Sequence, residues 1–143
     1  MINQISVFVE NRPGALRSMT AVLAENGIDM RAFSLAETSD FGIARIIVDD
    51  VYKTTTALRD AGFVHSVTQV LGVALSDAPG GLDAVLRTLA EADVNVEYMY
   101  AFLGGKKGKE AYMIFRVADN AKASAALAAK GVKQVEQEEM ASL

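Results

Sequence analysis

A short proline-glycine segment occurs twice in this chain and constrains its fold more than any other feature. The first copy is Asn11-Arg12-Pro13-Gly14-Ala15-Leu16, and the second is Asp77-Ala78-Pro79-Gly80-Gly81-Leu82. The two prolines are the only ones in the sequence and stand 66 positions apart. Each segment follows an alternating apolar run and precedes a helical apolar pattern, which indicates the same strand-to-helix corner built twice. The sequence therefore predicts two copies of one module.

Simple stereochemistry predicts how each corner is built. Proline suits the first position of a helix because its φ is fixed and its missing N–H needs no partner there. The side-chain oxygen of Asn11 or Asp77 can cap the open N–H groups of the first turn. Gly14 and Gly80 have no Cβ, so another molecule could approach the backbone closely. We therefore expect a helix N-terminus with free donors, where a carboxylate could bind.

Apolar periodicity gives each module the element order β-α-β-β-α-β, which is the ferredoxin-like arrangement. The expected strands of the first module cover residues 5–9, 28–37, 43–48 and 63–67. The second module repeats this order, and its last strand is expected over residues 132–138. Asp49 or Asp50 is expected to cap the second helix of the first module, and Asp119 or Asn120 the corresponding helix of the second.

The two modules are expected to cover residues 1–69 and 70–143. No linker rich in glycine, serine or proline occurs near Thr68-Gln69-Val70, so the last strand of the first module should run almost directly into the first strand of the second. Such a connection fixes the modules against each other. The predicted fold class is therefore α+β, with two ferredoxin-like modules side by side, one extended antiparallel sheet and helices on one face.

Aligning the two copies separates the two faces of the predicted sheet. Pairs that stay apolar in both copies should face the helices, namely Val7 with Val73, Ile46 with Phe115 and Phe33 with Met99. The opposite face then carries an apolar and aromatic set with two arginines: Phe8, Ile47, Tyr98, Tyr100, Phe102, Tyr112, Ile114, Arg45 and Arg116. Because a surface of this kind is rarely left in water, we expect it to pack on another subunit in a homodimer or a larger assembly.

Composition and charge argue against several classes of function. The net charge of −4 disfavours a phosphate-backbone partner, so no nucleic acid is expected. The sequence has no cysteine and one histidine, His65, so neither thiolate catalysis nor a metal site is expected. No signal segment is recognisable and the apolar run 70–75 is too short to cross a bilayer, so a cytoplasmic protein without membrane contact is expected. No nucleophile-base pair emerges, so no enzyme activity, catalytic residue or cofactor is expected.

Taken together, these features resemble the ACT domain, and specifically the small proteins made of two tandem ACT modules and nothing more. The resemblance covers the whole chain. Beside the two corners it rests on three further segments: Asn26-Gly27-Ile28-Asp29-Met30, Ala92-Asp93-Val94-Asn95-Val96 and Glu97-Tyr98-Met99-Tyr100-Ala101-Phe102. It implies a regulatory module that binds a free amino acid and biases an enzyme, as in phosphoglycerate dehydrogenase, aspartokinase and prephenate dehydratase. Here no catalytic domain is attached, so any regulated enzyme would be a separate partner.

The resemblance also implies a ligand site at the interface of a module pair, formed by the strand-one to helix-one loop of one module and the facing strand of its neighbour. Carried over by position, the expected ligand-binding residues are Asn11, Arg12, Gly14, Ala15, Leu16, Met30, Asp77, Ala78, Gly80, Gly81, Leu82, Tyr98, Met99 and Tyr100.

The chemistry of these loops fits a zwitterion. Backbone N–H groups would hold the carboxylate, and the side-chain oxygen of Asn11 or Asp77 would accept a hydrogen bond from the ammonium. Asp77 carries a negative charge that Asn11 lacks, so the two corners should differ in affinity. Aromatic and methionine residues near the expected site favour a larger ligand side chain, histidine or an aromatic one.

Several alternative interpretations stay open. Each corner could be a helix start without a ligand, and the chain would then be an oligomerisation or assembly module that acts on a partner protein. RNA binding through sheet aromatics is a third class, which the acidic balance disfavours.

Gly104-Gly105-Lys106-Lys107-Gly108 lacks the spacing of a phosphate loop and favours a flexible hairpin. The acidic run from Glu136 to Glu139 is interpreted as a solvated edge or tail, and His65 as an ordinary strand histidine.

Overall fold

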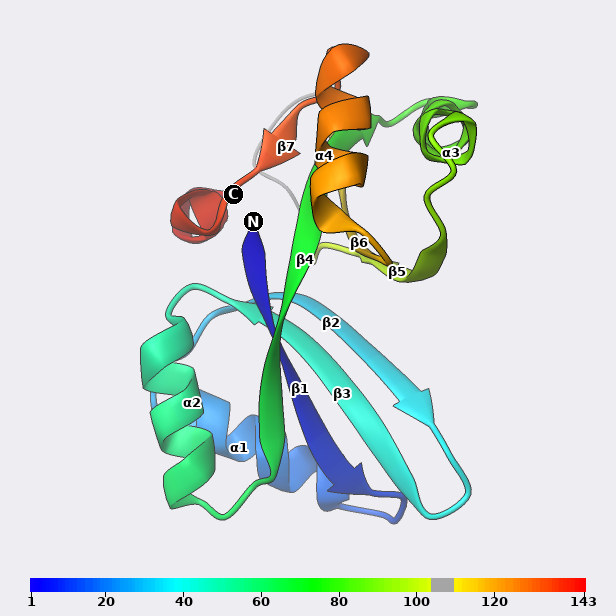
Figure 1. Cartoon of the computed structure of the whole chain (residues 1–143). Helices are drawn as coiled ribbons and strands as arrows, with labels where there is room; N and C mark the ends of the chain where they lie inside the picture. The colour runs from blue at the N-terminus through cyan, green and yellow to red at the C-terminus, as the bar shows by residue number, and fades with distance from the viewer. Residues whose placement is uncertain (104–109) are drawn as a thin grey trace. The chain divides into compact units, whose positions relative to one another are not determined.

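The computed structural model describes residues 1–103 and 110–143. Its elements in chain order are β1 (Ile2–Glu10), α1 (Ala15–Glu25), β2 (Met30–Glu37), β3 (Phe41–Val48), α2 (Val51–Asp60), β4 (His65–Ser76), α3 (Gly81–Glu91), β5 (Val96–Ala101), β6 (Glu110–Val117), α4 (Asn120–Ala129), β7 (Gln134–Val135) and the 3₁₀ helix η1 (Gln137–Ser142) (Figure 1). The hairpin expected at Gly104-Gly105-Lys106-Lys107-Gly108 lies outside the described residues. The α+β fold class predicted from the sequence is confirmed.

The chain divides into two compact units. We call residues Asn3–Thr68 the N-terminal unit, and Met1–Ile2 together with Gln69–Leu143 the C-terminal unit. Hydrogen bonds join the strands in the order β2-β3-β1-β4-β6-β5, with β7 paired to β4. Strand β4 is thus the last strand of the first β-α-β-β-α-β repeat and the first strand of the second, which is the continuous connection expected from the missing linker.

The N-terminal unit has one core between its strands and its two helices. β1 runs antiparallel to β3, with Ile5 opposite Ile46 and Val7 opposite Ala44. Met19 and Leu23 of α1 and Leu58 of α2 are buried with these side chains. Because alternate strand residues share a face, the apolar residues of β1 and β3 meet the apolar stripe of α1. The predicted helix-facing set Val7, Ile46 and Phe33 lies in or against this core, as expected.

The C-terminal unit repeats this core. β4 runs antiparallel to β6, with Leu71 opposite Phe115 and Val73 opposite Met113. Leu89 of α3 and Leu127 of α4 are buried where the N-terminal unit has Leu23 and Leu58. Met99 packs against this core, so the predicted helix-facing set of the second copy is also confirmed.

The second helix of each unit begins with the aspartate cap that the sequence predicts. Asp50 Oδ1 accepts a hydrogen bond of 2.9 Å from Lys53 N at the start of α2. Asp119 Oδ1 accepts a hydrogen bond of 3.0 Å from Lys122 N at the start of α4. Asn120, the other candidate, instead donates from Nδ2 to the carbonyl of Gln69.

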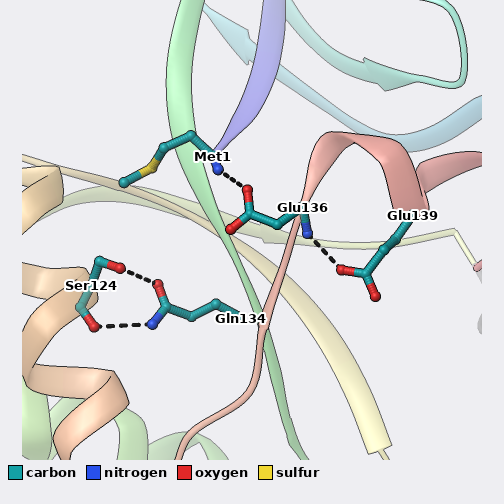
Figure 2. Close-up of polar contacts among 5 residues, drawn as sticks. All are labelled: Met1, Ser124, Gln134, Glu136 and Glu139. Atoms are coloured by element: carbon teal, nitrogen blue, oxygen red, sulfur yellow. Dashed lines mark hydrogen bonds and ion pairs between the residues drawn. The ribbon is translucent and has the colours of Figure 1, made fainter.

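The C-terminal segment differs from the strand expected over residues 132–138. Only β7 pairs with β4, and the chain then forms η1. The backbone N–H of Glu136 donates to the carboxylate of Glu139 at 2.8 Å (Figure 2). The Glu136 side chain in turn accepts from the backbone of Glu139. These reciprocal bonds form a capping box, so the acidic run begins a helical turn, in which Glu136 and Glu138 are exposed. The turn buries Met140.

Side chains also connect the start of the chain and helix α4 to this segment, all within the C-terminal unit. The amino group of Met1 contacts the carboxylate of Glu136 (Figure 2). Gln134 accepts a hydrogen bond from Ser124 Oγ at 2.7 Å and donates one to the Ser124 carbonyl at 3.0 Å. One set of bonds is thus made by the first residue of β7 and the other by the residue that follows the strand (Figure 2).

The face opposite the helices is less exposed than the sequence pattern predicts. Ile47 and Ile114 are fully buried and Tyr100 is 8% exposed, whereas Phe8 is 41% exposed. Strand parity assigns a residue to a face but does not say what covers that face. The apolar surface available to another subunit is therefore smaller than expected.

Among the described helices, none has the length and hydropathy of a membrane span.

Candidate functional site

The first proline-glycine corner is a type II β-turn between β1 and α1. The carbonyl of Arg12 accepts a hydrogen bond of 3.2 Å from Ala15 N. Gly14, the third residue of the turn, has φ 84° and ψ −13°. Proline at the second position and a glycine with positive φ at the third define this turn type. Glycine is required here because other residues adopt such a φ only under strain.

The second corner, between β4 and α3, has the same geometry. The carbonyl of Ala78 accepts a hydrogen bond of 3.0 Å from Gly81 N, and Gly80 has φ 86° and ψ −5°. Two segments with the same proline and glycine spacing therefore adopt one backbone conformation. The strand-to-helix corner predicted to be built twice is present in both units.

The start of each helix differs from the prediction in detail. α1 begins at Ala15 and α3 at Gly81, so each proline lies two residues before its helix and not at the first helical position. Gly14 and Gly80 are the N-cap residues, and within the described residues no side chain caps either helix. The left-handed glycine has to turn the chain before the helix can begin. The residues before the prolines, including Asn11 and Asp77, therefore do not act as caps.

Asn11 holds the first corner to the β2–β3 hairpin. Its Nδ2 donates to the carbonyl of Thr38 at 3.2 Å, and its backbone N–H donates to the carbonyl of Asp40 at 3.3 Å. Arg12 forms an ion pair with Glu10 at the end of β1. Since Nδ2 is the group engaged by the hairpin, Asn11 Oδ1 is the atom left to accept from a ligand.

Asp77, the counterpart of Asn11, lies in a different environment. It is exposed and lines a hollow of about 200 Å³ together with Phe102 and Tyr112 of the C-terminal unit. The two rings meet edge to face with centroids 5.9 Å apart. The two corners are thus alike in backbone and unlike in the polar groups beside them.

Two of the four predicted strand residues pack against the cores, and the other two stack on each other. Met30 packs against the core of the N-terminal unit, and Met99 against that of the C-terminal unit. Tyr98 and Tyr100 stack on each other with ring centroids 6.4 Å apart. Leu16 and Leu82, in the first turns of α1 and α3, are partly buried against the same cores. The loop residues therefore come together at each corner, while these larger side chains serve packing within their units.

Beside the first corner the N-terminal unit has a hollow of about 260 Å³, which we call the N-terminal hollow. Its walls are the end of β1, the first turn of α1 and the segment between α2 and β4. The lining residues are Phe8, Val9, Glu10, Arg12, Ala15, Ser18, Gly62, Phe63 and Val64.

The C-terminal unit has the equivalent hollow, which we call the C-terminal hollow. Its volume is about 440 Å³. The lining residues are Ala74, Leu75, Ser76, Gly81, Ala84, Val85, Glu110, Gly131, Val132 and Lys133. Sequence reasoning did not include the segment before the last strand of either unit. The repeated helix-ending glycines Gly62 and Gly131 could have identified it, since each is followed at once by a lining residue.

The charges beside the hollows differ. In the N-terminal hollow Glu10 and Arg12 neutralise each other. In the C-terminal hollow Lys133 and Glu110 take part in no ion pair within the described part of the chain, and Glu110 accepts a hydrogen bond of 3.2 Å from the Tyr112 hydroxyl. Near both hollows an uncapped helix presents its positive end. Across residues 1–103 and 110–143, acidic and histidine side chains form no group suited to a metal ion.

The fold and the duplicated corner define a pair of ACT modules. The family model for the ACT domain pair matches residues 1–143, and the chain belongs to this family. It is similar over 99% of its length to the crystal structure of protein BT0572 from Bacteroides thetaiotaomicron, of which it covers 96%, with 34% identity and a TM-score of 0.91. No curated protein matches the chain.

Two further solved structures share the fold at low identity. The ligand-free regulatory subunit of aspartate kinase from Thermus thermophilus is 17% identical with a TM-score of 0.68, and the match covers 91% of each chain. The corresponding subunit from Thermus flavus is 17% identical with a TM-score of 0.62, over 89% of this chain and 88% of that one.

Proposed function

We propose that this chain is a regulatory protein that binds a free amino acid beside its proline-glycine corners and transmits the binding to a partner enzyme. The observation that carries the proposal is the type II turn built twice in front of an uncapped helix, each time next to a hollow. Membership in the ACT domain pair family supports it. The protein itself performs no chemistry in this proposal.

The corner supplies complementary groups for a zwitterion. The second and third N–H groups of a helix have no partner inside the helix, so those of Leu16 and Arg17 can donate to a carboxylate at the first corner. Asn11 Oδ1 can accept from the ammonium while Nδ2 stays bonded to Thr38. At the second corner the N–H groups of Leu82 and Asp83 take the same role.

A thermal-shift screen of the twenty amino acids tests this function. A ligand that binds only the folded state stabilises it by roughly 2.7 kcal/mol at a free concentration of 100 times Kd. We expect at least one amino acid with a large side chain to raise the Tm at millimolar concentration. The amide of that amino acid, which has no carboxylate, and its N-acetyl derivative, which has no ammonium, should have little effect. No shift with any of the twenty would refute amino-acid binding.

An assembly function is the second candidate, and one observation favours it. Phe8 and Phe41 are 41% and 40% exposed on adjacent strands, with ring centroids 6.0 Å apart. Exposed aromatic pairs of this kind are common at protein interfaces. If copies of the chain assemble through this pair, Phe41→Ser should weaken the assembly and lower the mass measured by sedimentation equilibrium. A wild-type chain that stays monomeric at all concentrations would exclude self-assembly through this pair.

A further inference from the structure

The two hollows share one backbone hydrogen bond in equivalent positions. In the N-terminal unit the N–H of Phe8 donates to the carbonyl of Val64 at 3.0 Å. In the C-terminal unit the N–H of Ala74 donates to the carbonyl of Lys133 at 2.9 Å. These are equivalent positions in the two copies, so the strand that forms one wall is held in the same way in both. The side chains that line the two hollows, in contrast, differ.

Smaller side chains enlarge the C-terminal hollow. Where the N-terminal hollow is lined by Phe8 and Phe63, the C-terminal hollow is lined by Ala74 and Val132. Glu10 is likewise replaced by a shorter side chain, that of Ser76. The resulting volume of about 440 Å³ lies inside the range of roughly 300–1,000 Å³ that is usual for small-molecule sites. The N-terminal hollow, at about 260 Å³, lies below that range.

Both hollows carry one cation and one carboxylate, but Glu10 and Arg12 of the N-terminal hollow form an ion pair, whereas Lys133 and Glu110 of the C-terminal hollow form none within the described residues. Lys133 stands at the position of Val64, and Glu110 at that of Phe41. Both charges line a hollow whose remaining walls are mainly apolar, including Leu75, Val85 and Val132. A cation, an anion and an apolar surface around one space are what an apolar amino acid requires for its carboxylate, its ammonium and its side chain.

We infer that the C-terminal hollow, and not the N-terminal hollow, binds the ligand, and that the ligand is an amino acid with a large apolar side chain. This inference rests on the proposed function. Lys133 Nζ binds the carboxylate together with the N–H groups of Leu82 and Asp83, and the Glu110 carboxylate accepts from the ammonium. The ligand side chain packs on Ala84, Val85 and Val132. A polar side chain is disfavoured because most of the lining surface is apolar and would leave its polar atoms without partners.

Two matched substitutions test the position of the site. Ala84 and Ser18 are equivalent, exposed residues on the first turns of α3 and α1, and each lines its own hollow. Because both are exposed, a phenylalanine at either position is compatible with folding, which circular dichroism would verify. Titration calorimetry with L-leucine, L-methionine, L-phenylalanine, L-serine and L-aspartate then compares the variants. Ala84→Phe should weaken binding of the apolar ligands by roughly ten-fold or more, and Ser18→Phe should leave it unchanged.

Two further variants test the charges. Lys133→Val installs the residue of the N-terminal unit and removes the partner of the carboxylate, so it should weaken binding by roughly ten-fold or more. Glu110→Gln should weaken it by removing the negative charge that faces the ammonium. Lys53→Met, which changes an exposed lysine of α2 that lines neither hollow, is the control for net charge and should bind like the wild type.

The outcomes separate the inference from the function on which it rests. If the wild type binds none of the five probes nor any other amino acid, both fail. If it binds one and Ser18→Phe is the variant that loses affinity, the ligand occupies the N-terminal hollow and the inference alone is overturned. Undiminished binding by Ala84→Phe and Lys133→Val, or tighter binding of serine or aspartate than of leucine, methionine and phenylalanine, also overturns it.

Discussion

Gly81 is the residue at which the two corners differ most in their tolerance of a side chain. A Cβ at this position would overlap the carbonyl oxygen of Ser76, at the end of β4. The equivalent residue of the N-terminal unit is Ala15, whose Cβ is accommodated and nearly buried. The strand end therefore approaches the helix start more closely in the C-terminal unit, and only glycine fits there.

Gly81→Ala should consequently destabilise the protein. The backbone at Ser76 has to move to admit the methyl group, and overpacking of this kind costs about 1–3 kcal/mol. Ala15→Gly, the matched control, should cost less, roughly 0.5–1 kcal/mol, because it introduces flexibility without a clash. Urea unfolding followed by circular dichroism gives both free energies of unfolding. A Gly81→Ala protein as stable as the wild type would show that the contact with Ser76 is not restrictive.

Roles that depend on near neighbours in the sequence were predictable, whereas those that depend on a dihedral angle or on distant residues were not. Asp119 could be predicted as a cap because its partner is three residues away, and Val7 could be assigned to the core because strand side chains alternate. The helix start was missed because it depends on the left-handed φ of Gly14. The N-terminal hollow was missed because Ala15 and Phe63, which line it together, are far apart in the sequence.

At the scale of the element, α4 combines a small buried face with an aspartate cap. It is rich in alanine, and Ala123 and Leu127 are its buried residues. A helix with so small an apolar face gains little from packing, so the bond from Lys122 N to Asp119 Oδ1 is a larger part of its stability.

Asp119→Ala should therefore lower the free energy of unfolding by about 1 kcal/mol, within the range of 0.5–2 kcal/mol known for caps. Asp119→Asn keeps an oxygen acceptor and should retain most of the stability. Urea denaturation measures the two variants against the wild type. Equal losses for alanine and asparagine would mean that the charge, and not the capping hydrogen bond, accounts for the effect.

The C-terminal segment shows how two elements compete for one stretch of chain. The apolar alternation predicted a strand over residues 132–138, but Glu136 and Glu139 form a capping box, and the chain leaves the sheet after β7. The acceptors of the box lie only three residues apart, so a helical turn forms without any distant partner. Burial of Met140 adds a packing contribution that the strand pattern did not reveal.

At the scale of the whole molecule, two strands are each divided between the units. β4 contributes its first residues to the N-terminal unit and the rest to the C-terminal unit, and Ile2, at the start of β1, belongs to the C-terminal unit. A strand cannot lose its order in one half without affecting the hydrogen bonds of the other half. We therefore expect the two units to unfold in one cooperative transition.

Leu58→Ala and its counterpart Leu127→Ala test this cooperativity. Each removes a fully buried side chain from one core and should cost about 2–5 kcal/mol. Hydrogen exchange read by mass spectrometry should then show Leu58→Ala lowering protection in peptides of β6 and α4 as well as in those of β1 and β3. Loss of protection confined to residues 3–68 would contradict a single transition.

The position of Ile2 also limits how this protein can be dissected. A fragment starting at residue 69 would lose Ile2, a fully buried side chain that approaches Gly72 so closely that a Cβ at that position would clash with it. A fragment ending at residue 68 would keep Ile2 but would lack the rest of the C-terminal unit, to which Ile2 belongs. The C-terminal unit consists of two segments of chain, so no single cut yields two complete units. Recombination of such modules between relatives would succeed only if the first two residues were exchanged together with the second half.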